Sequence, residues 1–385
     1  MNPPVIAALL LAAGRGTRFG ADQPKQYLPL LGRPVLRHAA EALLVEGLVT
    51  LLQPVCPPGE ANTIAAMLSG LPSLPPVVGG ATRQHSVRHG LDALAAWAPD
   101  VVLVHDSARP IVPRGTIGRL LAALETHPGA IPAQPVADTL KRGAAGVIEA
   151  TVPRTGLFRA QTPQAFRYAA LVAAHRAMTT EATDDASMLE AQGLSVALVD
   201  GSETNIKITF PEDLDRVEAM LMSRLIPRVG TGFDVHRTEA GRPMVLCGVV
   251  VPCAFGLEGH SDADVGIHAL CDAIYGALAE GDIGRWFPPS EMQWKNADSA
   301  QFLRHAAERV AARGGVLANV DVTLMCEMPR IGPHRDAMQV RLAALLGVPL
   351  GRVSVKATTT ERLGFTGRGE GIAAQAAATV LLPFA

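Results

Sequence analysis

The first half of the chain alternates short apolar runs with longer segments in which apolar residues recur every three or four positions. The short runs predict buried strands, and the longer segments predict helices. The expected strands are Val5–Leu11, Val101–His105, Ala130–Pro135 and Leu194–Val199. The expected helices are Arg33–Glu46, Gly115–Leu124, Tyr168–Met178 and Pro211–Leu225. This alternation indicates an α/β domain with a parallel sheet and helices on both faces.

The pattern changes after Ile226-Pro227-Arg228, where glycines and β-type residues become frequent. Expected strands here are Arg228–Val235, Met244–Val251, Leu317–Met325 and Arg352–Thr358, and expected helices are Asp262–Ala279, Ser299–Arg313 and Asp336–Leu346. This mixture is typical of an α+β domain. Because 385 residues are too many for one ordinary core, we expect two domains, residues 1–225 and 226–385, joined by a short linker.

Composition narrows the class of protein. Hydrophobic residues make up 48% of the chain and charged residues 18%, which is enough apolar material for packed cores. The net charge of −2 lacks the basic excess of a nucleic-acid binder. Five cysteines without a CxxC pair favour neither disulfides nor a cysteine zinc site. Val5–Ala13 is too short to span a bilayer and follows no basic segment. We therefore expect a cytoplasmic protein without membrane or nucleic-acid partners.

A glycine-rich loop follows the first expected strand, in the run from Ala12 to Gly20. Backbone N–H groups of such loops cradle phosphates. The loop lacks a Walker lysine-serine pair, and Phe19 stands where a dinucleotide fingerprint needs its third glycine. A glycine turn that only reverses the chain remains the alternative. The nearby Arg15, Arg18 and Lys25 nevertheless suit a nucleoside triphosphate, because they offset charge on an attacked phosphate.

Three further segments supply polar side chains that fit the same site. Residues 79–86 form a second small-residue loop, Asp106 ends an expected strand, and Lys207 lies on an expected strand at residues 205–209. Ligands bind at the carboxyl ends of the strands in open α/β sheets. Taken singly, Asp106 also fits a turn or helix cap, and Lys207 fits a solvated strand lysine.

The motifs LAAGRGTRFG, PKQYLPL, GGATRQHSV, VHDSARP and TNIKITFPEDL resemble the 2-C-methyl-D-erythritol 4-phosphate cytidylyltransferase family over residues 3–225. The resemblance implies a Rossmann-like nucleotidyltransferase sheet. It also implies a reaction that joins CTP, accompanied by Mg²⁺, to 2-C-methyl-D-erythritol 4-phosphate and releases pyrophosphate. Ser107 stands where the family usually has alanine, and we expect no change of reaction from it.

The resemblance also implies roles for individual residues. Arg18 and Lys25 would stabilise the α-phosphate, and Gly14 and Gly16 belong to the phosphate loop. The remaining expected contacts are Gly80, Arg83 and Ser86 with the cytidine, Asp106 near the ribose and metal, and Arg154 and Lys207, with Thr139 nearby, on the methylerythritol phosphate.

The second domain contains a candidate metal site. Asp234 and His236 are two residues apart, so on a strand their side chains face the same way. Asp264, His268 and Asp272 are four apart and share a helical face, with Ser261 as the expected N-cap. We expect His268 as a third ligand, with Asp264 or Asp272 orienting its ring. Two histidines and a carboxylate leave the fourth position of a catalytic zinc site open. An Asp–His hydrogen bond and a solvated helix face are the alternatives.

The tail predicts a second phosphate site. Threonines 358–360 and Glu361 precede a segment with repeated glycines that contains Arg368, and Glu361 could hold Mg²⁺ against a diphosphate. A flexible glycine turn is the alternative.

The motifs GFDVH, GHSDADVGIHAL, GDIGRWFPP, NVDVT and KATTTERLGFTGRGEG resemble the methylerythritol cyclodiphosphate synthase family over residues 228–383. The resemblance implies a homotrimer with active sites between subunits. In the implied reaction, the 2-phosphate of a CDP-methylerythritol derivative attacks the β-phosphate, which closes a ring and releases CMP.

The implied ligands of Zn²⁺, or a similar divalent ion, are Asp234, His236 and His268, and Mg²⁺ would bind Glu361. Other implied contacts are Thr359 and Arg368 with phosphates, His260 and Asp282 with the methylerythritol portion, Pro329 and Arg330 with cytosine, and Phe365 near the trimer axis. The chain departs from the family at Pro289, usually acidic, and at Arg330, usually lysine. Gly266 inside a helix has no functional explanation at this level.

The two implied steps are not consecutive, because no kinase loop occurs in the chain. CDP-methylerythritol must leave, be phosphorylated by a separate kinase, which this protein could contact, and return. Trimers joined by dimeric first domains would give a hexameric homo-oligomer. The alternatives are a sugar-phosphate nucleotidyltransferase of other specificity fused to a metal phosphohydrolase, and a non-catalytic sensor of cytidine nucleotides.

Overall fold

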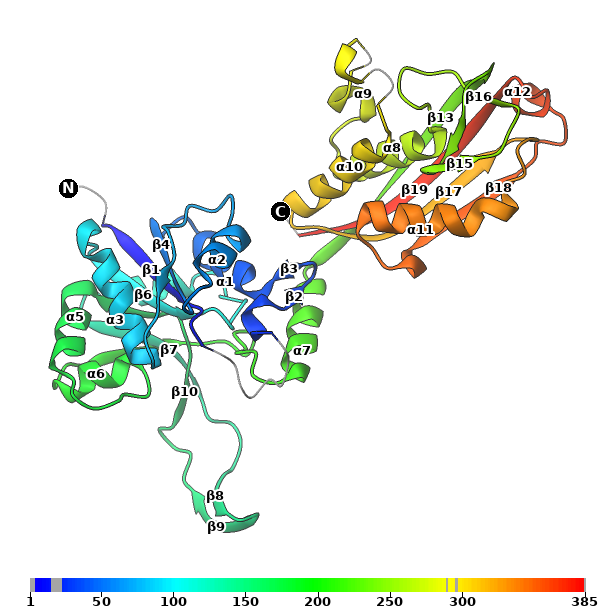
Figure 1. Ribbon diagram of the computed structural model, residues 1–385. Helices are drawn as coiled ribbons and strands as arrows, with labels where there is room; N and C mark the ends of the chain where they lie inside the picture. The colour runs from blue at the N-terminus through cyan, green and yellow to red at the C-terminus, as the bar shows by residue number, and fades with distance from the viewer. Residues whose placement is uncertain (1–3, 15–22, 289, 295–296, 384–385) are drawn as a thin grey trace. The chain divides into compact units, whose positions relative to one another are not determined.

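The computed structural model describes residues 4–14, 23–288, 290–294 and 297–383 (Figure 1). Contacts divide the chain into two compact units, Met1–Leu221 and Met222–Ala385. Each unit has its own core. Among the described residues, no helix combines the length and apolarity needed to cross a bilayer.

The first unit is built on one sheet, ordered β10-β7-β11-β6-β1-β4-β5, with β12 also paired to β7. Its strands are β1 Ile6–Leu11, β4 Leu51–Cys56, β5 Val77–Val78, β6 Val101–Asp106, β7 Gly129–Pro135, β10 Phe158–Ala160, β11 Gln164–Arg167 and β12 Val196–Asp200. β1 runs parallel to β4 and β6, and β12 runs parallel to β7.

The predicted parallel pairing is present among β1, β4, β5 and β6 and between β7 and β12, and the sheet also contains two strands that the sequence did not reveal, β10 and β11. β10 is antiparallel to β7, and β11 is antiparallel to both β6 and β7. No helix lies between β7 and β11 in the chain. Because a parallel return needs a long crossover, the chain turns back antiparallel instead.

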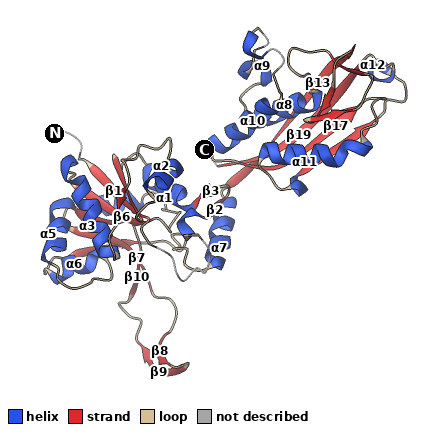
Figure 2. Ribbon diagram, in the orientation of Figure 1, coloured by secondary structure: helices blue, strands red, loops and turns tan. Residues whose placement is uncertain are grey.

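Helices cover both faces of this sheet, as the sequence predicts (Figure 2). One face carries α1 Val35–Leu44, α2 Ala61–Met67 and α4 Thr116–Ala123, and the other carries α3 Arg83–Leu94, α5 Tyr168–Ala177 and α6 Asp185–Ala191. Alternate residues of β1 pack into the cores on the two faces of the sheet. Ala8 and Leu10 belong to one core, and Ala7 and Leu9 belong to the other. The α/β fold class is therefore confirmed.

Shorter elements complete the first unit. The hairpin of β2 (Pro29–Leu30) and β3 (Arg33–Pro34) precedes α1, so the helix predicted from Arg33 begins at Val35. Helix α7 (Pro211–Met222) packs through Val217 in a small cluster with Leu30. A second hairpin, β8 (Leu140–Ala144) and β9 (Val147–Val152), forms an arm that projects from the sheet (Figure 1).

The second unit has a sheet ordered β16-β13-β19-β17-β18. Its strands are β13 Leu225–Ala240, β16 Phe255–Leu257, β17 Val316–Met325, β18 Val353–Thr358 and β19 Gly371–Pro383. The helices are α8 Val265–Leu278, α9 Ile283–Trp286, α10 Ala300–Ala312, α11 Arg335–Leu346 and α12 Gly364–Gly367. Helices α8, α10 and α11 share one core with the sheet.

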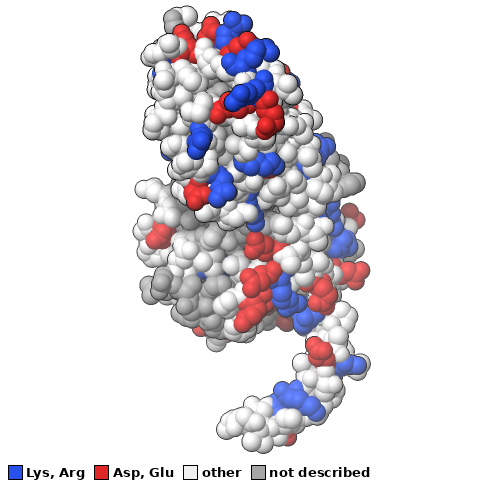
Figure 3. Space-filling view, turned by 90° about the vertical axis from the view of Figure 1, so that its right-hand side faces the viewer, with Lys and Arg blue, Asp and Glu red and all other residues white. Residues whose placement is uncertain are grey.

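On the face drawn in Figure 3, basic and acidic side chains are interspersed.

Two predicted strands are wrong. The run Met244–Val251 forms a hairpin, β14 (Met244–Leu246) and β15 (Val249–Val251), which turns at Cys247 and Gly248 with φ of 51° and 74°. Residues 205–209 form no strand. Their extended chain is held instead by single bonds such as Ile208 N–H to Ala108 O at 2.9 Å.

The predicted N-cap of α8 is also wrong. Asp264, not Ser261, caps this helix and accepts from the N–H groups of Gly266 and Ile267, both at 3.1 Å. A Cβ at position 266 would lie 2.6 Å from Cys247 Sγ. The glycine therefore permits the close approach of the β14–β15 turn.

Candidate active sites in the two units

A cavity of about 930 Å³ opens at the carboxyl ends of β1, β4 and β6. Its walls come from Ala13 and Gly14 at the start of the phosphate loop, the residues 79–86 segment and the ends of the strands. Of the predicted site residues, it brings together Gly14, Lys25, Gly80, Arg83, Ser86, Asp106 and Lys207. Gly16 and Arg18 lie outside the described residues.

The start of α3 forms one wall of this cavity. Thr82 caps the helix by accepting from His85 N–H at 3.2 Å, and Ser86 Oγ accepts from Gly80 N–H at 3.2 Å. A Cβ on Gly80 would lie 2.3 Å from His85 Cβ, so only glycine lets the loop lie this close to the helix. The N-terminal turn of α3 therefore presents its partial positive charge to the cavity.

Asp106 is the buried anion at the centre of this site. Lys207 Nζ lies 2.7 Å from its carboxylate, Arg83 Nε 3.6 Å and Arg109 Nε 4.0 Å. Burial works to raise the pKa of Asp106, but Lys207, Arg83 and Arg109 together hold it well below its usual value. One carboxylate thus faces several cations, and the surplus positive charge suits an anionic ligand.

Arg83 is fixed from behind by a pair that the sequence did not reveal. Its guanidinium donates to Asp185 Oδ2 at 2.7 Å, and the other oxygen of Asp185 lies 3.2 Å from His175 Nε2. The Asp185 side chain has no exposed surface. Burial opposes its ionisation, but the charge of Arg83 lowers the pKa of Asp185 overall. Because Arg83 and Asp185 are far apart in sequence, no local pattern pairs them.

Two more contacts order the cavity. Lys25 Nζ donates to Ile208 O at 2.6 Å. The buried amide of Gln26 donates to Ala12 O at 2.7 Å and to Gly14 O at 3.0 Å, and so holds the start of the phosphate loop.

A smaller cavity of about 240 Å³ lies beside Lys207. Its basic lining residues also include Arg109, Arg159 and Arg216. Arg109 was not among the predicted site residues, although its position three residues after Asp106 was a usable signal. The predicted residues Thr139 and Arg154 are exposed at the base of the arm, just before β8 and just after β9, and line neither of these two cavities.

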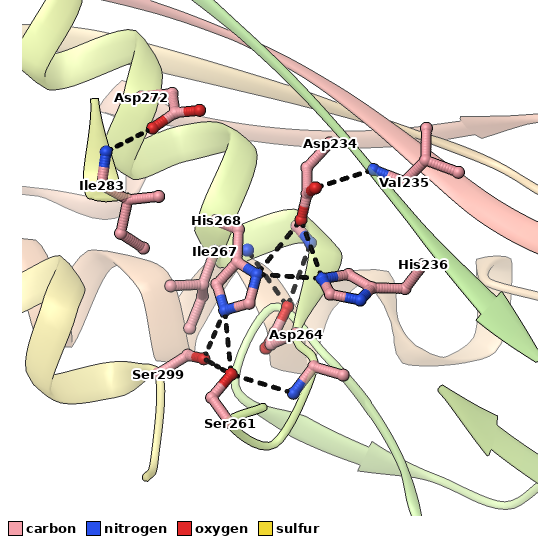
Figure 4. Close-up of polar contacts among 12 residues, drawn as sticks. Asp234, Val235, His236, Ser261, Asp264, Ile267, His268, Asp272, Ile283 and Ser299 are labelled. Atoms are coloured by element: carbon pink, nitrogen blue, oxygen red, sulfur yellow. Dashed lines mark hydrogen bonds and ion pairs between the residues drawn. The ribbon is translucent and has the colours of Figure 1, made fainter. Parts of the chain in front are cut away.

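The second unit brings together the predicted metal ligands (Figure 4). Ligand atoms of Asp234, His236 and His268 lie within 4.8 Å of one another. Asp234 Oδ2 is 3.0 Å from His236 Nε2 and 3.1 Å from His268 Nδ1, and the two ring nitrogens are 3.1 Å apart. Strand β13 supplies two of these side chains, and α8 supplies the third.

The chemistry of these three atoms fits a divalent cation. His236 Nδ1 lies 2.7 Å from Glu258 O, which can only accept, so this nitrogen carries the proton and Nε2 offers a lone pair. Burial alone would lower the pKa of His236, but the adjacent Asp234 carboxylate, which accepts from the protonated ring, raises it overall. An oxygen and two nitrogens that converge at about 3 Å repel each other unless a proton or a cation lies between them. The residues therefore fit zinc or a similar ion with an open fourth position.

The predicted orienting role of Asp264 and Asp272 is wrong. Asp264 accepts from Cys247 N–H at 2.8 Å besides capping α8, and Asp272 accepts from Ile283 N–H at 2.7 Å. His268 Nε2 faces two serines instead, Ser299 Oγ at 2.9 Å and Ser261 Oγ at 3.2 Å (Figure 4). Asp264 precedes the helix, so the four-residue spacing does not place it on the helical face.

The tail segment is organised by a carboxylate that the sequence did not reveal. Glu327 Oε1 accepts from Thr360 N–H at 3.2 Å and from Arg362 N–H at 3.1 Å. Thr359 Oγ1 donates to Glu361 at 2.8 Å. Glu361 is not part of the three-residue cluster.

The other predicted contacts of the second unit lie around its surface. Arg368 pairs with Glu370 at 2.8 Å, and Asp282 caps α9 by accepting from Arg285 N–H at 3.0 Å. The remaining residues are the exposed His260, Arg330 and Phe365, and Pro329, which follows a cis peptide bond. Pro289 lies outside the described residues.

Comparison with known proteins decides the family. The model of the family 2-C-methyl-D-erythritol 4-phosphate cytidylyltransferase matches residues 6–223, and the YgbB family model matches residues 227–381. A bifunctional enzyme IspD/IspF of Granulibacter bethesdensis is 62% identical over 378 residues, which cover 98% of this chain and 99% of that protein. The chain belongs to the bifunctional IspD/IspF family.

Two solved structures are also similar. The bifunctional IspDF of Campylobacter jejuni is 32% identical, covers 98% of both chains and has a TM-score of 0.49. A 2C-methyl-D-erythritol-2,4-cyclodiphosphate synthase in a form with bound CDP is 38% identical and covers 40% of this chain and 99% of that chain, with a TM-score of 0.37.

The predicted function is thereby confirmed. This IspD/IspF chain is a bifunctional enzyme of the methylerythritol phosphate pathway, with cytidylyltransferase and cyclodiphosphate synthase domains. Its transferase forms CDP-methylerythritol from CTP and methylerythritol 4-phosphate. Its synthase forms the cyclic diphosphate and releases CMP.

Proposed function

We propose that the cytidylyl transfer takes place in the 930 Å³ cavity of the first unit. A 4-phosphate oxygen of methylerythritol phosphate bonds to the α-phosphorus of CTP, and the bond from that phosphorus to the β-phosphate oxygen breaks. Lys25 and Arg18 offset the charge on the α-phosphate, and the loop of Gly14 and Gly16 cradles the phosphates. Mg²⁺ bound with CTP supplies further positive charge.

We assign the remaining contacts of this cavity by their place in its walls. Gly80, Arg83 and Ser86 hold the cytidine at the start of α3. Lys207 holds the 4-phosphate, and Asp106 fixes the position of the Lys207 ammonium from 2.7 Å. The observation that carries this proposal is the buried Asp106, surrounded by cations at the sheet edge where α/β folds bind ligands.

We propose that the cyclisation takes place at Asp234, His236 and His268, which would hold Zn²⁺ or a similar divalent ion. The bound ion would supply positive charge and a fixed direction for a phosphate oxygen. In the reaction, an oxygen of the 2-phosphate bonds to the β-phosphorus, and the bond from that phosphorus to the CMP oxygen breaks. The convergence of three lone-pair atoms within 4.8 Å carries this proposal.

Other residues of the second unit, assigned from the family resemblance, complete the proposed synthase site. Glu361 would hold Mg²⁺ against the diphosphate, since its carboxylate is exposed beside the Thr359 hydroxyl. Further proposed contacts are Thr359 and Arg368 with phosphates, Pro329 and Arg330 with cytosine, His260 and Asp282 with the methylerythritol portion, and Phe365 at the subunit axis.

We propose a homo-oligomer assembled through both domains, residues 1–225 and 226–385. Val147 and Ile148 at the end of the arm are 68% and 64% exposed, which supports contact with a second copy. Such contact would carry Thr139 and Arg154 of the arm to a partner's cavity. Val229 and Phe233 of β13, 67% and 58% exposed, support a trimer through the second domain, and both contacts together give a hexamer.

Two cellular features are also part of the proposal. The five cysteines are free, which supports a reducing, cytoplasmic location. The intermediate must be phosphorylated between the two reactions, so contact with the separate pathway kinase would shorten its path.

Two experiments test the assignment. Purified protein with CTP and methylerythritol phosphate should release pyrophosphate but make no cyclic product until the kinase and ATP are added. Ring formation without the kinase would overturn the proposed order. Other nucleotides and sugar phosphates should release pyrophosphate more slowly, whereas equal rates would favour the transferase of other specificity.

His268→Ala separates the two sites. We expect loss of the cyclase with cytidylyl transfer largely kept, because His268 belongs to the second unit alone. Equal loss of both activities would contradict two independent sites.

A further inference from the structure

We propose that Ser299 and Asp262 orient the ring of His268, so that its Nδ1 and not its Nε2 serves as the metal-binding atom. Both are positioning residues that act through His268. The proposal deepens the synthase site and rests on the proposed metal at Asp234, His236 and His268.

Ser299 stands at the start of α10, with no exposed surface. Its Oγ lies 2.9 Å from His268 Nε2, on the side of the ring away from Asp234 (Figure 4). The same hydroxyl donates to Asp262 Oδ1, and the Ser299 N–H donates to Asp262 Oδ2 at 3.1 Å. Both polar groups of one serine are therefore held by one carboxylate.

This arrangement fixes the direction of the hydrogen bonds. An ionised carboxylate only accepts, so the Ser299 hydroxyl hydrogen points to Asp262 and its lone pair faces His268. His268 Nε2 must then donate, which means that it carries the proton of the neutral ring. Nδ1 is left with its lone pair, 3.1 Å from both Asp234 Oδ2 and His236 Nε2. The chain of bonds selects the tautomer that can bind a cation at the cluster.

The two histidines carry their protons on different ring nitrogens, and each leaves one lone pair facing the cluster. His236 donates its Nδ1 proton to the backbone carbonyl of Glu258 at 2.7 Å, which no substitution of a side chain removes. His268 depends instead on two side chains: Ser299, which follows it by 31 residues, and Asp262, which lies just before α8. Ser261 Oγ is a weaker partner of its Nε2, at 3.2 Å, and also accepts from Ala263 N–H. The orientation of His268 is therefore open to a specific test.

The test measures metal affinity in the full-length protein, by titration with Zn²⁺ against a chelator of known affinity and by the visible absorption of bound Co²⁺. Ser299→Ala should weaken Zn²⁺ binding about 10- to 100-fold, in the range found for residues that support metal ligands. Ser299→Thr keeps the hydroxyl and should restore most of the affinity.

Asp262→Asn tests the direction of the bonds. The amide nitrogen of asparagine cannot accept from the Ser299 hydroxyl. When the asparagine NH₂ group faces Ser299, the Ser299 hydroxyl donates to His268 Nε2 instead. The proton of the neutral His268 ring then moves to Nδ1. We expect weaker Zn²⁺ binding and a changed Co²⁺ spectrum, with far-ultraviolet circular dichroism and cytidylyl transfer unchanged.

Asp272→Asn is the matched control, because Asp272 lies on α8 one turn from His268 but its hydrogen bond among the described residues is with Ile283 N–H and not with the His268 ring. Its Zn²⁺ affinity should stay within about twofold of the parent protein. Unchanged affinity in Ser299→Ala, or equal losses in Ser299→Ala and Asp272→Asn, would overturn the inference. If the parent protein itself bound no Zn²⁺ at this cluster, the proposed metal site would fail instead.

Discussion

Gly232 offers a sharp test of how the metal cluster is built. It lies on β13 two residues before Asp234 and faces Ala269 of α8, the residue after His268. A Cβ on Gly232 would lie 2.0 Å from Ala269 O and 2.8 Å from Ala273 N. Both obstacles are backbone atoms, so no side chain can turn away to make room.

The size of the displacement follows from this contact. Carbon and oxygen approach no closer than about 3.3 Å in ordinary C–H···O contacts, so Gly232→Ala must separate α8 from β13 by roughly 1.3 Å. Metal–ligand distances tolerate only about 0.2 Å. Since β13 holds Asp234 and His236 while α8 holds His268, we expect loss of most Zn²⁺ affinity. Overpacking should also cost the second unit about 3 kcal/mol or more.

Three measurements check this expectation: Zn²⁺ titration against a chelator, thermal unfolding, and pyrophosphate release. Cytidylyl transfer should persist, because the first unit has its own cores. Gly276→Ala is the control, since its added Cβ would meet nothing nearer than 3.9 Å. It should bind Zn²⁺ normally and gain up to about 1 kcal/mol of helix stability. Normal Zn²⁺ binding in Gly232→Ala, or equal damage from Gly276→Ala, would refute the reasoning.

Three further predictions concern His105, Asp185 and Glu327. Burial lowers the pKa of His105 to about 4 from 6.5, so the unfolded chain binds an extra proton between these values. Urea unfolding should therefore show the first unit losing about 3 kcal/mol as pH falls from 6.5 to 4, and His105→Gln should flatten this profile. Asp185→Ala removes the carboxylate that holds the Arg83 guanidinium and should raise KM for CTP about tenfold with little change in kcat. Asp185→Asn should raise KM by less. A fall in kcat alone would argue against that positioning role. Glu327→Ala should lower cyclase activity about tenfold by loosening the segment at Thr360, and Glu327→Gln should retain most of it; unchanged cyclase in Glu327→Ala would contradict this role.

The sequence predicted those features of the metal site that depend on local periodicity. Asp234 and His236 face the same way because alternate residues of a strand do. The role of Asp264 was wrong because a helical spacing holds only inside the helix, and α8 begins one residue later. Ser299 could not be found, since its contact with His268 arises from the packing of α10 against α8 and not from any spacing.

In the first unit too, features set by local sequence could be predicted, and contacts set by tertiary packing could not. Asp106 at the end of β6 and the loop after β1 were predictable, because parallel strands bring their carboxyl ends to one edge. Lys207 was predicted on a strand, yet its segment lies outside the sheet. Its role depends on the 2.7 Å bond to Asp106, which joins segments about a hundred residues apart. The Arg83–Asp185 pair is likewise a product of tertiary structure.

The two sites complement ligands of opposite charge. The first cavity gathers Lys25, Arg83 and Lys207 around Asp106 and is left with positive charge that phosphates neutralise. The second cluster gathers lone pairs that a cation neutralises. A ligand stabilises the folded unit that binds it by an amount set by its own concentration and affinity. CTP should therefore raise the unfolding temperature of the first unit and Zn²⁺ that of the second, and each transition should remain where it was when only the other ligand is added.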